Sequence, residues 1–289
     1  MSYGDRVRVS LGVFLVLSCF VLSFVFGKQQ SIQIKGSDTM VNLAQSWAEK
    51  YMETNPNEFI AVTGGGSGTG IASLINSSCD IAASSREIKQ KEIQLARQKG
   101  VEPNQIKAAL DGLAIVVNPS NPVGRLTMKQ LADIFTGRVK NWKELGGSDS
   151  KIVILSREVN SGTHVYLKEH VLRNNDPNDK SEFAPEALML SSSQAIADEV
   201  ANNSGCIGYY GMGYISSKQK AVSVAKDEKS AYVEPTIDNV VKGAYPISRP
   251  LFLYTNGQPK EEVKKFIDFI LSAEGQKIVL ETDFVPIKK

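Results

Sequence analysis

Residues 59–75 of the chain read FIAVTGGGSGTGIASLI, which is a short apolar strand joined to a helix by a glycine-rich loop. We expect the strand at 59–63, and the apolar residues from Ile71 onward recur at the spacing of one helix face. A similar unit precedes it, with an alternating strand at 31–35 and helical spacing of apolar residues over about 39–54. Strand, loop and helix in this order predict an α/β protein in which helices pack on sheets.

Short apolar segments and amphipathic stretches continue to alternate along the rest of the chain. Thr127 and Gln130 have the spacing of a capping box, and Gly137 is suited to end that helix. The other elements that we expect are strands at 80–83, 113–118, 152–156, 207–210 and 250–255, and helices at 89–99, 127–135, 163–171, 193–200, 260–271 and 273–280.

Composition narrows the class of protein. The 289 residues include 42% apolar and 22% charged residues, which is typical of a globular chain and long enough for about two domains. The formal net charge is only +2, and the lysines are scattered among glutamates. A nucleic-acid-binding protein usually carries a stronger basic excess or a basic stripe, so that class is disfavoured.

The N-terminus predicts export from the cytoplasm. Arg6 and Arg8 precede a nearly unbroken apolar run at 9–26, which is followed by Gly27. This pattern predicts a signal peptide over residues 1–27 and a periplasmic or extracytoplasmic mature protein. An uncleaved membrane anchor is the alternative, because the run is long enough to span a bilayer.

Cysteine and histidine usage predicts neither a metal site nor a cofactor. Lipidation at Cys19 is disfavoured, because apolar residues follow where a lipoprotein would begin a polar tether. We expect Cys79 and Cys206 to be buried free thiols, with a disulfide as the alternative in an oxidising compartment. His164 and His170 are six residues apart and would lie on different faces of a helix. No cluster has the spacing of metal ligands.

Three predicted strand-to-helix junctions share one chemistry. They are GSDT at 36–39, GSGTG at 66–70 and NSGT at 160–163. Each places short hydroxyls and bare amides where the first N–H groups of a helix are unpaired, an arrangement that suits a small oxyanion. Any one of them could be an ordinary helix cap, but three in one chain favour an anion site. Arg157 and Arg86 could add guanidinium groups, although an arginine at a strand end is often a surface ion pair.

Enzymatic interpretations of these loops fail on their details. The glycine-rich loop does not match GxGxxG, because Ile71 stands where Gly66-x-Gly68 would need its third glycine. The sequence lacks GxxxxGK[ST], and Thr69 rules out the G-x-S-x-G elbow around Ser67. We therefore expect a binding protein rather than an enzyme.

Six stretches, in the same order and covering nearly all of the mature chain, resemble the phosphate-binding proteins of phosphate-specific ABC importers, the PstS type. They are KGSDTM at 35–40, GSGTG at 66–70, DIAASSR at 80–86, LTMKQLADIFTG at 126–137 running to NWKEL at 141–145, SREVNSGT at 156–163 and GCIGY at 205–209.

The resemblance implies an α/β type II periplasmic-binding-protein fold, with two lobes, two hinge strands and a ligand cleft between the lobes. Lobe one would comprise residues 31–111 and 245–289, and lobe two residues 112–244. The strands at 113–117 and 251–254 would lie near the hinge.

The resemblance also implies a set of phosphate-binding residues from both lobes. Several family members carry an aspartate at the position of Ser85, which accepts the proton of hydrogen phosphate and repels sulfate. Asp38 is the candidate for that role here, with capping of its own helix as the alternative. The implied binding residues are Ser37, Asp38, Thr39, Ser67, Ser85 and Arg86 from lobe one, and Arg157, Ser161, Gly162 and Thr163 from lobe two.

The function implied is capture of inorganic phosphate by lobe closure and delivery to an ABC transporter permease in the membrane. We expect a monomer without cofactor. Two alternatives stay open at this point. One is a different tetrahedral oxyanion, such as sulfate or molybdate, which the serine at position 85 permits. The other is a membrane-anchored phosphate sensor or scavenger.

Overall fold

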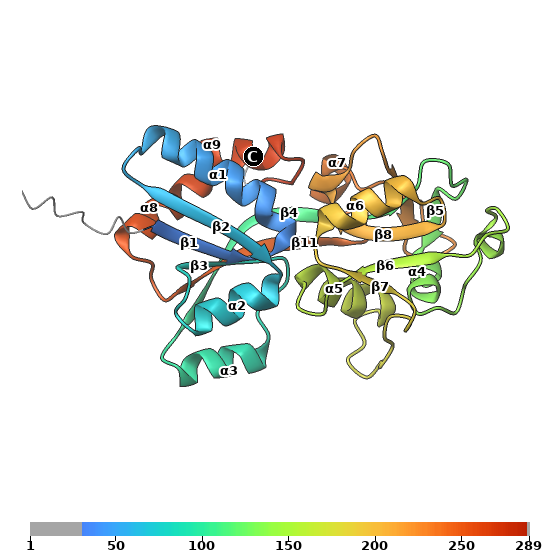
Figure 1. Cartoon of the computed structure of the whole chain (residues 1–289), viewed down its shortest axis with the longest axis horizontal. Coiled ribbons are helices and arrows are strands. Elements are labelled where there is room, and N and C mark those ends of the chain that lie inside the picture. The colour runs from blue at the N-terminus through green and yellow to red at the C-terminus, as the bar shows by residue number, and fades with distance from the viewer. Residues whose placement is uncertain (1–30, 288–289) are drawn as a thin grey trace, which may run out of the picture.

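The computed structural model describes residues 31–287, which form two α/β lobes side by side (Figure 1). The predicted signal peptide at residues 1–27 lies outside the described residues. One lobe contains β1 (Ser31–Gly36), α1 (Val41–Thr54), β2 (Phe59–Gly65), α2 (Ser67–Ile75), β3 (Ile81–Ser84), α3 (Gln90–Gln98), α8 (Glu261–Ile270) and α9 (Ala273–Glu281). The other contains β5 (Arg125–Thr127), α4 (Met128–Phe135), β6 (Val153–Arg157), α5 (Gly162–Leu167), β7 (Leu188–Leu190), α6 (Ser193–Asn202), β8 (Cys206–Gly211), β9 (Lys220–Ala221), β10 (Ser223–Ala225) and α7 (Ile237–Val241).

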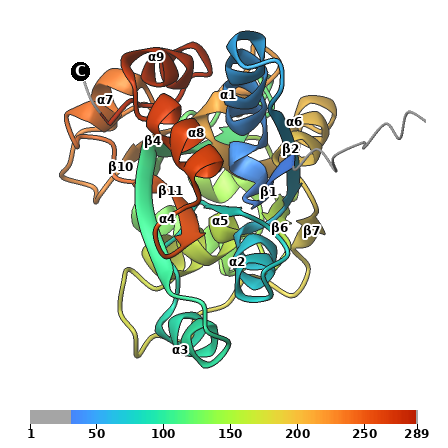
Figure 2. The same cartoon turned by 90° about the vertical axis from the view of Figure 1, so that its left-hand side faces the viewer.

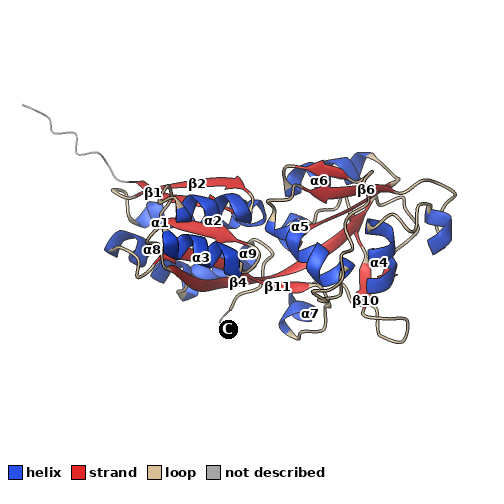
Figure 3. Ribbon diagram, turned by 90° about the horizontal axis from the view of Figure 1, so that it is seen from below, coloured by secondary structure: helices blue, strands red, loops and turns tan. Residues whose placement is uncertain are grey.

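Two long strands connect the lobes, β4 (Pro103–Val117) and β11 (Ser248–Asn256) (Figure 3). The sheet has the strand order β2-β1-β3-β11-β4-β8-β6-β7. Residues 103–112 of β4 pair antiparallel with β11, and residues 113–117 pair antiparallel with β8. The strand β4 therefore passes from one lobe to the other near Gly112.

Helices cover both faces of the first lobe's sheet, with α1, α8 and α9 on one side and α2 and α3 on the other (Figure 2). The central strand β3, which pairs parallel with β1, is fully buried between these helices. The edge strand β2, which also pairs parallel with β1, has no fully buried residue. Trp47 of α1 and Phe266 of α8 are fully buried in this lobe's core.

The second lobe has a separate core. Phe135 on α4, Trp142 and Tyr209 on β8 are all buried in one cluster. Phe135 and Tyr209 pack edge to face at 5.4 Å between ring centroids, a favourable aromatic geometry. Val285, near the C-terminal end, packs in the second core and pairs with Leu110 at the crossing.

Most predicted elements occur within a few residues of their expected limits. The capping box of Thr127 and Gln130 is present, and Gly137 ends the helix with φ +76°. The glycine-rich loop is shorter than predicted, because Gly65 and Gly66 turn the chain at φ +105° and +97° and α2 begins at once. The helix expected at 193–200 extends to Asn202 and is capped by the Ser192 side chain. A π-helical turn at Lys168–Leu172 follows α5.

Cys79 and Cys206 are free thiols in different lobes. Burial raises the thiol pKa to about 11 for Cys79 and about 12 for Cys206, so both are protonated and unreactive at neutral pH. Within residues 31–287, no group of three or more His, Cys, Asp or Glu side chains could hold a metal ion. In the same range, no helix has the length and hydropathy needed to span a membrane.

Candidate functional site

The first predicted loop turns sharply at Gly36, where β1 ends. Gly36 has φ +137°, and a Cβ there would clash with the carbonyl of Ala83, so only glycine fits. The adjacent Ser37 N–H donates to the same carbonyl at 2.8 Å. This turn places Ser37, Asp38 and Thr39 at the carboxyl end of β1, in a 3₁₀ turn at Asp38–Met40 that leads into α1.

The glycine-rich loop before α2 and the segment after β3 meet at two buried serines. Ser67 is the first residue of α2, and Ser85 follows β3. The Ser85 N–H donates to Ser67 Oγ at 3.0 Å, and the two hydroxyls lie 3.3 Å apart. The helix α2 can come so close to β1 because Gly70 faces Gly36, where an added Cβ would lie 2.6 Å from the Gly36 Cα. Both serine hydroxyls face the other lobe, because they are the atoms that a Cβ on Gly162 of that lobe would meet.

In the second lobe, the loop after β6 presents the start of α5. Ser161 caps this helix, and its Oγ accepts from the N–H groups of Thr163 at 3.2 Å and His164 at 3.4 Å. Gly162 and Thr163 form the first turn of the helix and are buried. Their amides lie at the positive end of α5.

The two sets of groups meet across the lobes. The Thr39 and Thr163 hydroxyls lie 2.8 Å apart. A Cβ on Gly162 would clash with Ser67 Oγ and would lie 2.7 Å from Ser85 Oγ. We call Thr39, Ser67, Ser85, Gly162 and Thr163 the hydroxyl cradle. The predicted residues that form it are thus brought together from four segments that are far apart in sequence.

The rim next to the cradle is also closed across the lobes. The Gly68 N–H donates to the Asn160 carbonyl at 2.9 Å, and Asn160 Nδ2 donates to the Gly65 carbonyl at 2.8 Å. These contacts join the glycine-rich loop of one lobe to the NSGT loop of the other. In this structure the two loops are therefore in direct contact.

Asp38 and Arg157 form an ion pair between the lobes, in which the Arg157 side chain is 2% exposed and the Asp38 side chain 16% exposed. Asp38 Oδ2 lies 3.0 Å from Arg157 Nη1 and accepts from the Ser193 N–H at 2.8 Å. The carboxylate therefore does not cap its own helix. Arg157 also donates from Nη1 to Ser193 Oγ, from Nη2 to the Ser191 carbonyl and from Nε to the Leu190 carbonyl. All three nitrogens of Arg157 have protein partners here, and the phosphate contacts expected of Asp38 and Arg157 stay predictions.

Arg86 forms a salt bridge within its own lobe. Its Nη1 and Nη2 donate to the two carboxylate oxygens of Glu92 at 2.8 and 2.7 Å. Burial alone would raise the pKa of Glu92, but hydrogen bonds from Arg86 and from the Lys89 backbone hold it below its usual value. Arg86 lies next to Ser85, and its terminal nitrogens point to Glu92. Direct phosphate binding by Arg86 also stays a prediction.

The sequence pattern does not single out Arg249 and Asp111, which lie at the hinge. Both side chains are almost completely buried, with 1% and 0% exposure. Arg249 Nε and Nη2 donate to Asp111 Oδ2 at 3.1 and 2.9 Å, and Nη2 also donates to Thr163 Oγ1 at 3.0 Å. Desolvation raises the pKa of the Asp111 carboxyl, and Arg249 opposes that shift. In the sequence, Asp111-Gly112 is typical of a turn. The ion pair of Asp111 with Arg249 can be recognised only once β4 and β11 are aligned as neighbouring strands.

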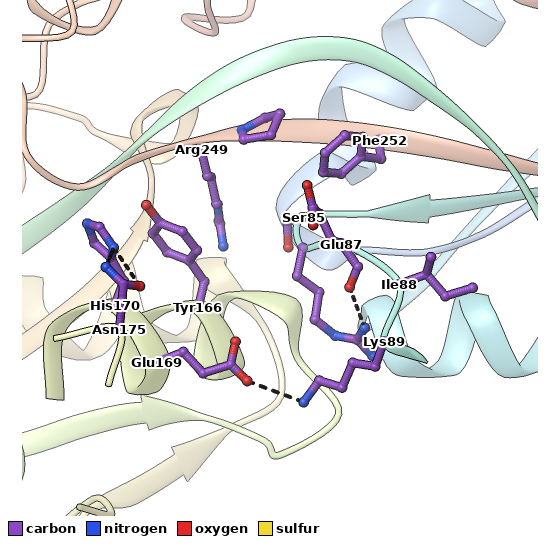
Figure 4. A pocket seen from close by; sticks show the side chains of 12 residues that line it. Ser85, Glu87, Ile88, Lys89, Tyr166, Glu169, His170, Asn175, Arg249 and Phe252 are labelled. Carbon is purple, nitrogen blue, oxygen red and sulfur yellow. Dashed lines mark hydrogen bonds and ion pairs between the residues drawn. The ribbon is translucent and has the colours of Figure 1, made fainter. Parts of the chain in front are cut away.

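A pocket of about 400 Å³ opens beside the cradle (Figure 4). Ser85 and Arg249 line it, together with Tyr166 and Phe252. At its rim, Lys89 Nζ of one lobe lies 3.5 Å from Glu169 Oε1 of the other. This is the more open side of the cleft, whereas the side with Asp38 and Arg157 is closed by buried contacts.

The chemistry of the site is that of anion binding. Hydroxyls, helix N-terminal amides and guanidinium groups are all hydrogen-bond donors, and they can replace the hydration shell of a small tetrahedral oxyanion. His164, the residue after Thr163, is buried. Its ring stacks on Phe183, and Nδ1 lies 3.3 Å from Ser156 Oγ. Burial lowers the pKa of His164 to about 4. The Ser156 hydroxyl is fully buried and also bonded to Tyr209 OH at 2.7 Å, so it is not placed as a nucleophile.

Comparison with known proteins agrees with this fold. Residues 27–274 match the model of the PBP superfamily domain. The phosphate-binding protein PstS of Pseudomonas aeruginosa is 33% identical over 278 residues, covering 90% of this chain and 84% of that protein. PstS of Bacillus subtilis is 33% identical over 261 residues, covering 89% of this chain and 81% of that protein.

Solved structures of proteins with similar sequences have the same fold. A putative phosphate ABC transporter substrate-binding protein with bound phosphate, from Clostridium perfringens, superposes with a TM-score of 0.80 at 33% identity, covering 90% of this chain and 100% of that one. An ABC-type phosphate transport receptor from Vibrio cholerae has a TM-score of 0.69 at 34% identity, with coverage of 88% and 99%. The chain belongs to the PstS-type family of substrate-binding proteins in the PBP superfamily, with the predicted α/β periplasmic-binding-protein fold.

Proposed function

We propose that this chain is the phosphate-binding component of a phosphate ABC importer and that it works by closing its two lobes around inorganic phosphate. The observation that carries the proposal is the hydroxyl cradle, in which Thr39, Ser67 and Ser85 of one lobe meet Gly162 and Thr163 of the other. Membership of the PstS-type family supports the same ligand. The protein binds and carries its ligand without chemical change.

Closure is the step that couples binding to transport. Each lobe supplies only half of the donors, so high affinity requires both halves to reach the anion together. The ligand therefore shifts an open–closed equilibrium towards the closed form. Micromolar binding would need a net free energy of about −8 kcal/mol, which a set of charge-assisted hydrogen bonds can supply. We propose lobe limits at 31–111 with 245–289, and at 112–244, with the hinge where β4 and β11 cross.

The partner follows from this mechanism. A membrane permease that contacts both lobes can recognise the closed form, because only closure brings the two surfaces into a fixed relation. We propose that the mature protein works outside the inner membrane, as a monomer, after removal of residues 1–27. The apolar run at 9–26 supports that location.

Selectivity against sulfate requires a group that accepts the proton of hydrogen phosphate. Ser85 lies beside Ser67 in the cradle, and a serine hydroxyl can donate to sulfate as well as to phosphate. We propose Asp38 for this role, since a carboxylate can only accept a hydrogen bond and so favours a protonated oxyanion. For this the carboxylate would have to share its contacts with Arg157 and the Ser193 N–H.

Calorimetric titration of the leaderless protein, stripped of ligand, with phosphate, sulfate and molybdate tests the proposal. We expect one phosphate per chain and little response to sulfate. In Arg157→Ala, binding should weaken by about 100-fold or more, because the change also leaves the partly buried Asp38 carboxylate without its cation. Asp38→Asn should gain sulfate binding. If the wild-type protein fails to bind phosphate, or prefers another oxyanion, the ligand assignment is wrong and only the fold remains.

A further inference from the structure

We infer that Arg249, from the hinge strand β11, is a further phosphate-contacting residue and that its Nη1 donates directly to the anion in the cradle. The inference rests on the proposed function. It adds a charged group from the hinge to a site otherwise built from the ends of strands and helices in the two lobes.

The first support is the incomplete hydrogen bonding of Arg249. Its Nε and Nη2 are satisfied by Asp111 and Thr163. Nη1 is buried and has no partner among residues 31–287. Leaving a buried charged donor unpaired is costly, so native proteins rarely do it without a ligand or water to complete the bond.

The second support comes from the other buried polar atoms without a partner. Within the described chain these are Ser37 Oγ, Arg86 Nε and Tyr210 OH. Ser37 and Arg86 flank the cradle on the lobe-one side, so three of the four atoms belong to residues around one site. Such a concentration is expected where an anion completes the hydrogen bonds.

The third support is a comparison of the three arginines near the cradle. Arg157 has protein partners on all three nitrogens. Arg86 has both terminal nitrogens bonded to Glu92. Arg249 alone, among the described arginines at the site, keeps a terminal nitrogen without a partner. It is therefore the guanidinium best prepared to donate to a ligand.

Position gives the fourth support. Arg249 Nη2 donates to Thr163 Oγ1, which lies 2.8 Å from Thr39 Oγ1, so the guanidinium touches the cradle itself. Figure 4 shows the side chain extending from β11 into the pocket between Ser85 and Tyr166. The Tyr166 ring packs at 5.3 Å from Arg249 Cζ and limits movement on that side. An anion that contacts the Ser85 and Thr163 hydroxyls is then within reach of Nη1.

The location also links the ligand to the hinge. Arg249 and Asp111 are direct partners in the β11–β4 register, one position from where β4 leaves β11 for β8. A phosphate held by Nη1 would thus be tied to both crossing strands as well as to both lobes. Binding through Arg249 would favour the hinge geometry of the closed form.

The experiment measures inorganic phosphate binding by calorimetry in the wild type and in variants of the buried pair. Arg249→Met alone would leave Asp111 buried without a cation, so it is combined with Asp111→Asn. We expect the double variant to bind phosphate roughly 10- to 100-fold more weakly, the usual effect of losing a hydrogen bond to a charged group. Arg249→Lys should show a smaller loss, because an ammonium keeps the charge but not the guanidinium fork. Arg97→Met, which removes an exposed arginine of lobe one, is the matched control.

Asp111→Asn alone separates ligand contact from a purely structural role. If Arg249 binds the anion, this variant should bind phosphate more tightly, because it removes a buried negative charge that competes for the same guanidinium. A structural role predicts weaker binding in both Asp111→Asn and the double variant. The inference is overturned by that result, or by a double variant that unfolds cooperatively and binds phosphate within about twofold of the wild type. Loss of phosphate binding in the wild type would instead refute the proposed function.

Discussion

Gly162→Ala should abolish tight phosphate binding while leaving the ligand-free protein at least as stable. Gly162 is the first residue of α5, and its backbone has φ in the ordinary negative range. An added methyl would clash with Ser67 Oγ, lie 2.7 Å from Ser85 Oγ and 3.0 Å from Ser67 Cβ. All three atoms belong to the opposite lobe. The clash therefore exists only when the lobes are closed.

The size of the effect follows from these contacts. The Ser67 hydroxyl can rotate away, but its Cβ cannot, so the lobes must stay apart at the centre of the cradle. If two charge-assisted hydrogen bonds to phosphate are lost, the cost is about 3 kcal/mol, or roughly 100-fold in Kd. In the open form, alanine replaces glycine in the first turn of a helix, which stabilises by about 0.5 kcal/mol or leaves stability unchanged.

Titration calorimetry with phosphate and thermal unfolding without phosphate measure the two effects separately. Gly124→Ala is the matched control, because it lies in the same lobe and no atom lies within 4 Å of its added Cβ. A Gly162→Ala protein that binds phosphate within about threefold of the wild type would show that closure does not bring these residues together. A large drop in ligand-free stability would show that the methyl clashes within the lobe itself.

Two further predictions follow from charges around the site. Lys89→Ala removes a cross-lobe ion pair with Glu169 at the partly exposed rim of the pocket. We expect the Kd for phosphate to rise by no more than about fivefold, since such pairs contribute about 0.2–1 kcal/mol. A larger rise in Kd, measured by calorimetry, would contradict this prediction. His164 is buried with its pKa lowered from 6.5 to about 4, so the unfolded chain binds more protons and stability falls as pH drops from about 6.5 to about 4. This pKa difference contributes about 3 kcal/mol to the free energy of unfolding. Urea unfolding of His164→Gln across this pH range should show a smaller loss of stability with falling pH than the wild type. An equal pH dependence of stability in both proteins would refute the prediction.

Local patterns in the sequence were sufficient for most of the architecture. Alternation and helical spacing predicted β1, α1 and β2, and the capping box of Thr127 and Gln130 occurs as expected. These features depend on neighbours a few residues apart, which the sequence displays directly. The three loops that meet at the cradle were found for the same reason, because each is a contiguous set of small hydroxyl residues and glycines.

Features that depend on distant pairing were not predicted. Residues 103–112 of β4 include Pro103 and Asp111-Gly112, which locally favour a turn, and this part becomes a strand only because β11 pairs with it. Arg249 stayed hidden because its importance comes from Asp111, which is 138 positions away. Likewise, nothing in the local sequence indicates that the Asp38 carboxylate would bond to Arg157 and to the start of α6.

The distribution of charge at the site suits a carrier that must release its ligand. Each arginine near the cradle is matched by one carboxylate: Asp38 with Arg157, Glu92 with Arg86, and Asp111 with Arg249. A dianion is then held mainly by oriented hydroxyls and amides, with little excess positive charge. Such donors act over a short range, so they lose the anion as soon as one lobe withdraws, whereas uncompensated arginines would retain it in the open form. Of the three pairs, Asp38 with Arg157 joins the two lobes and must separate on opening. Under the proposed mechanism, lobe opening imposed by a permease would therefore be sufficient to release phosphate.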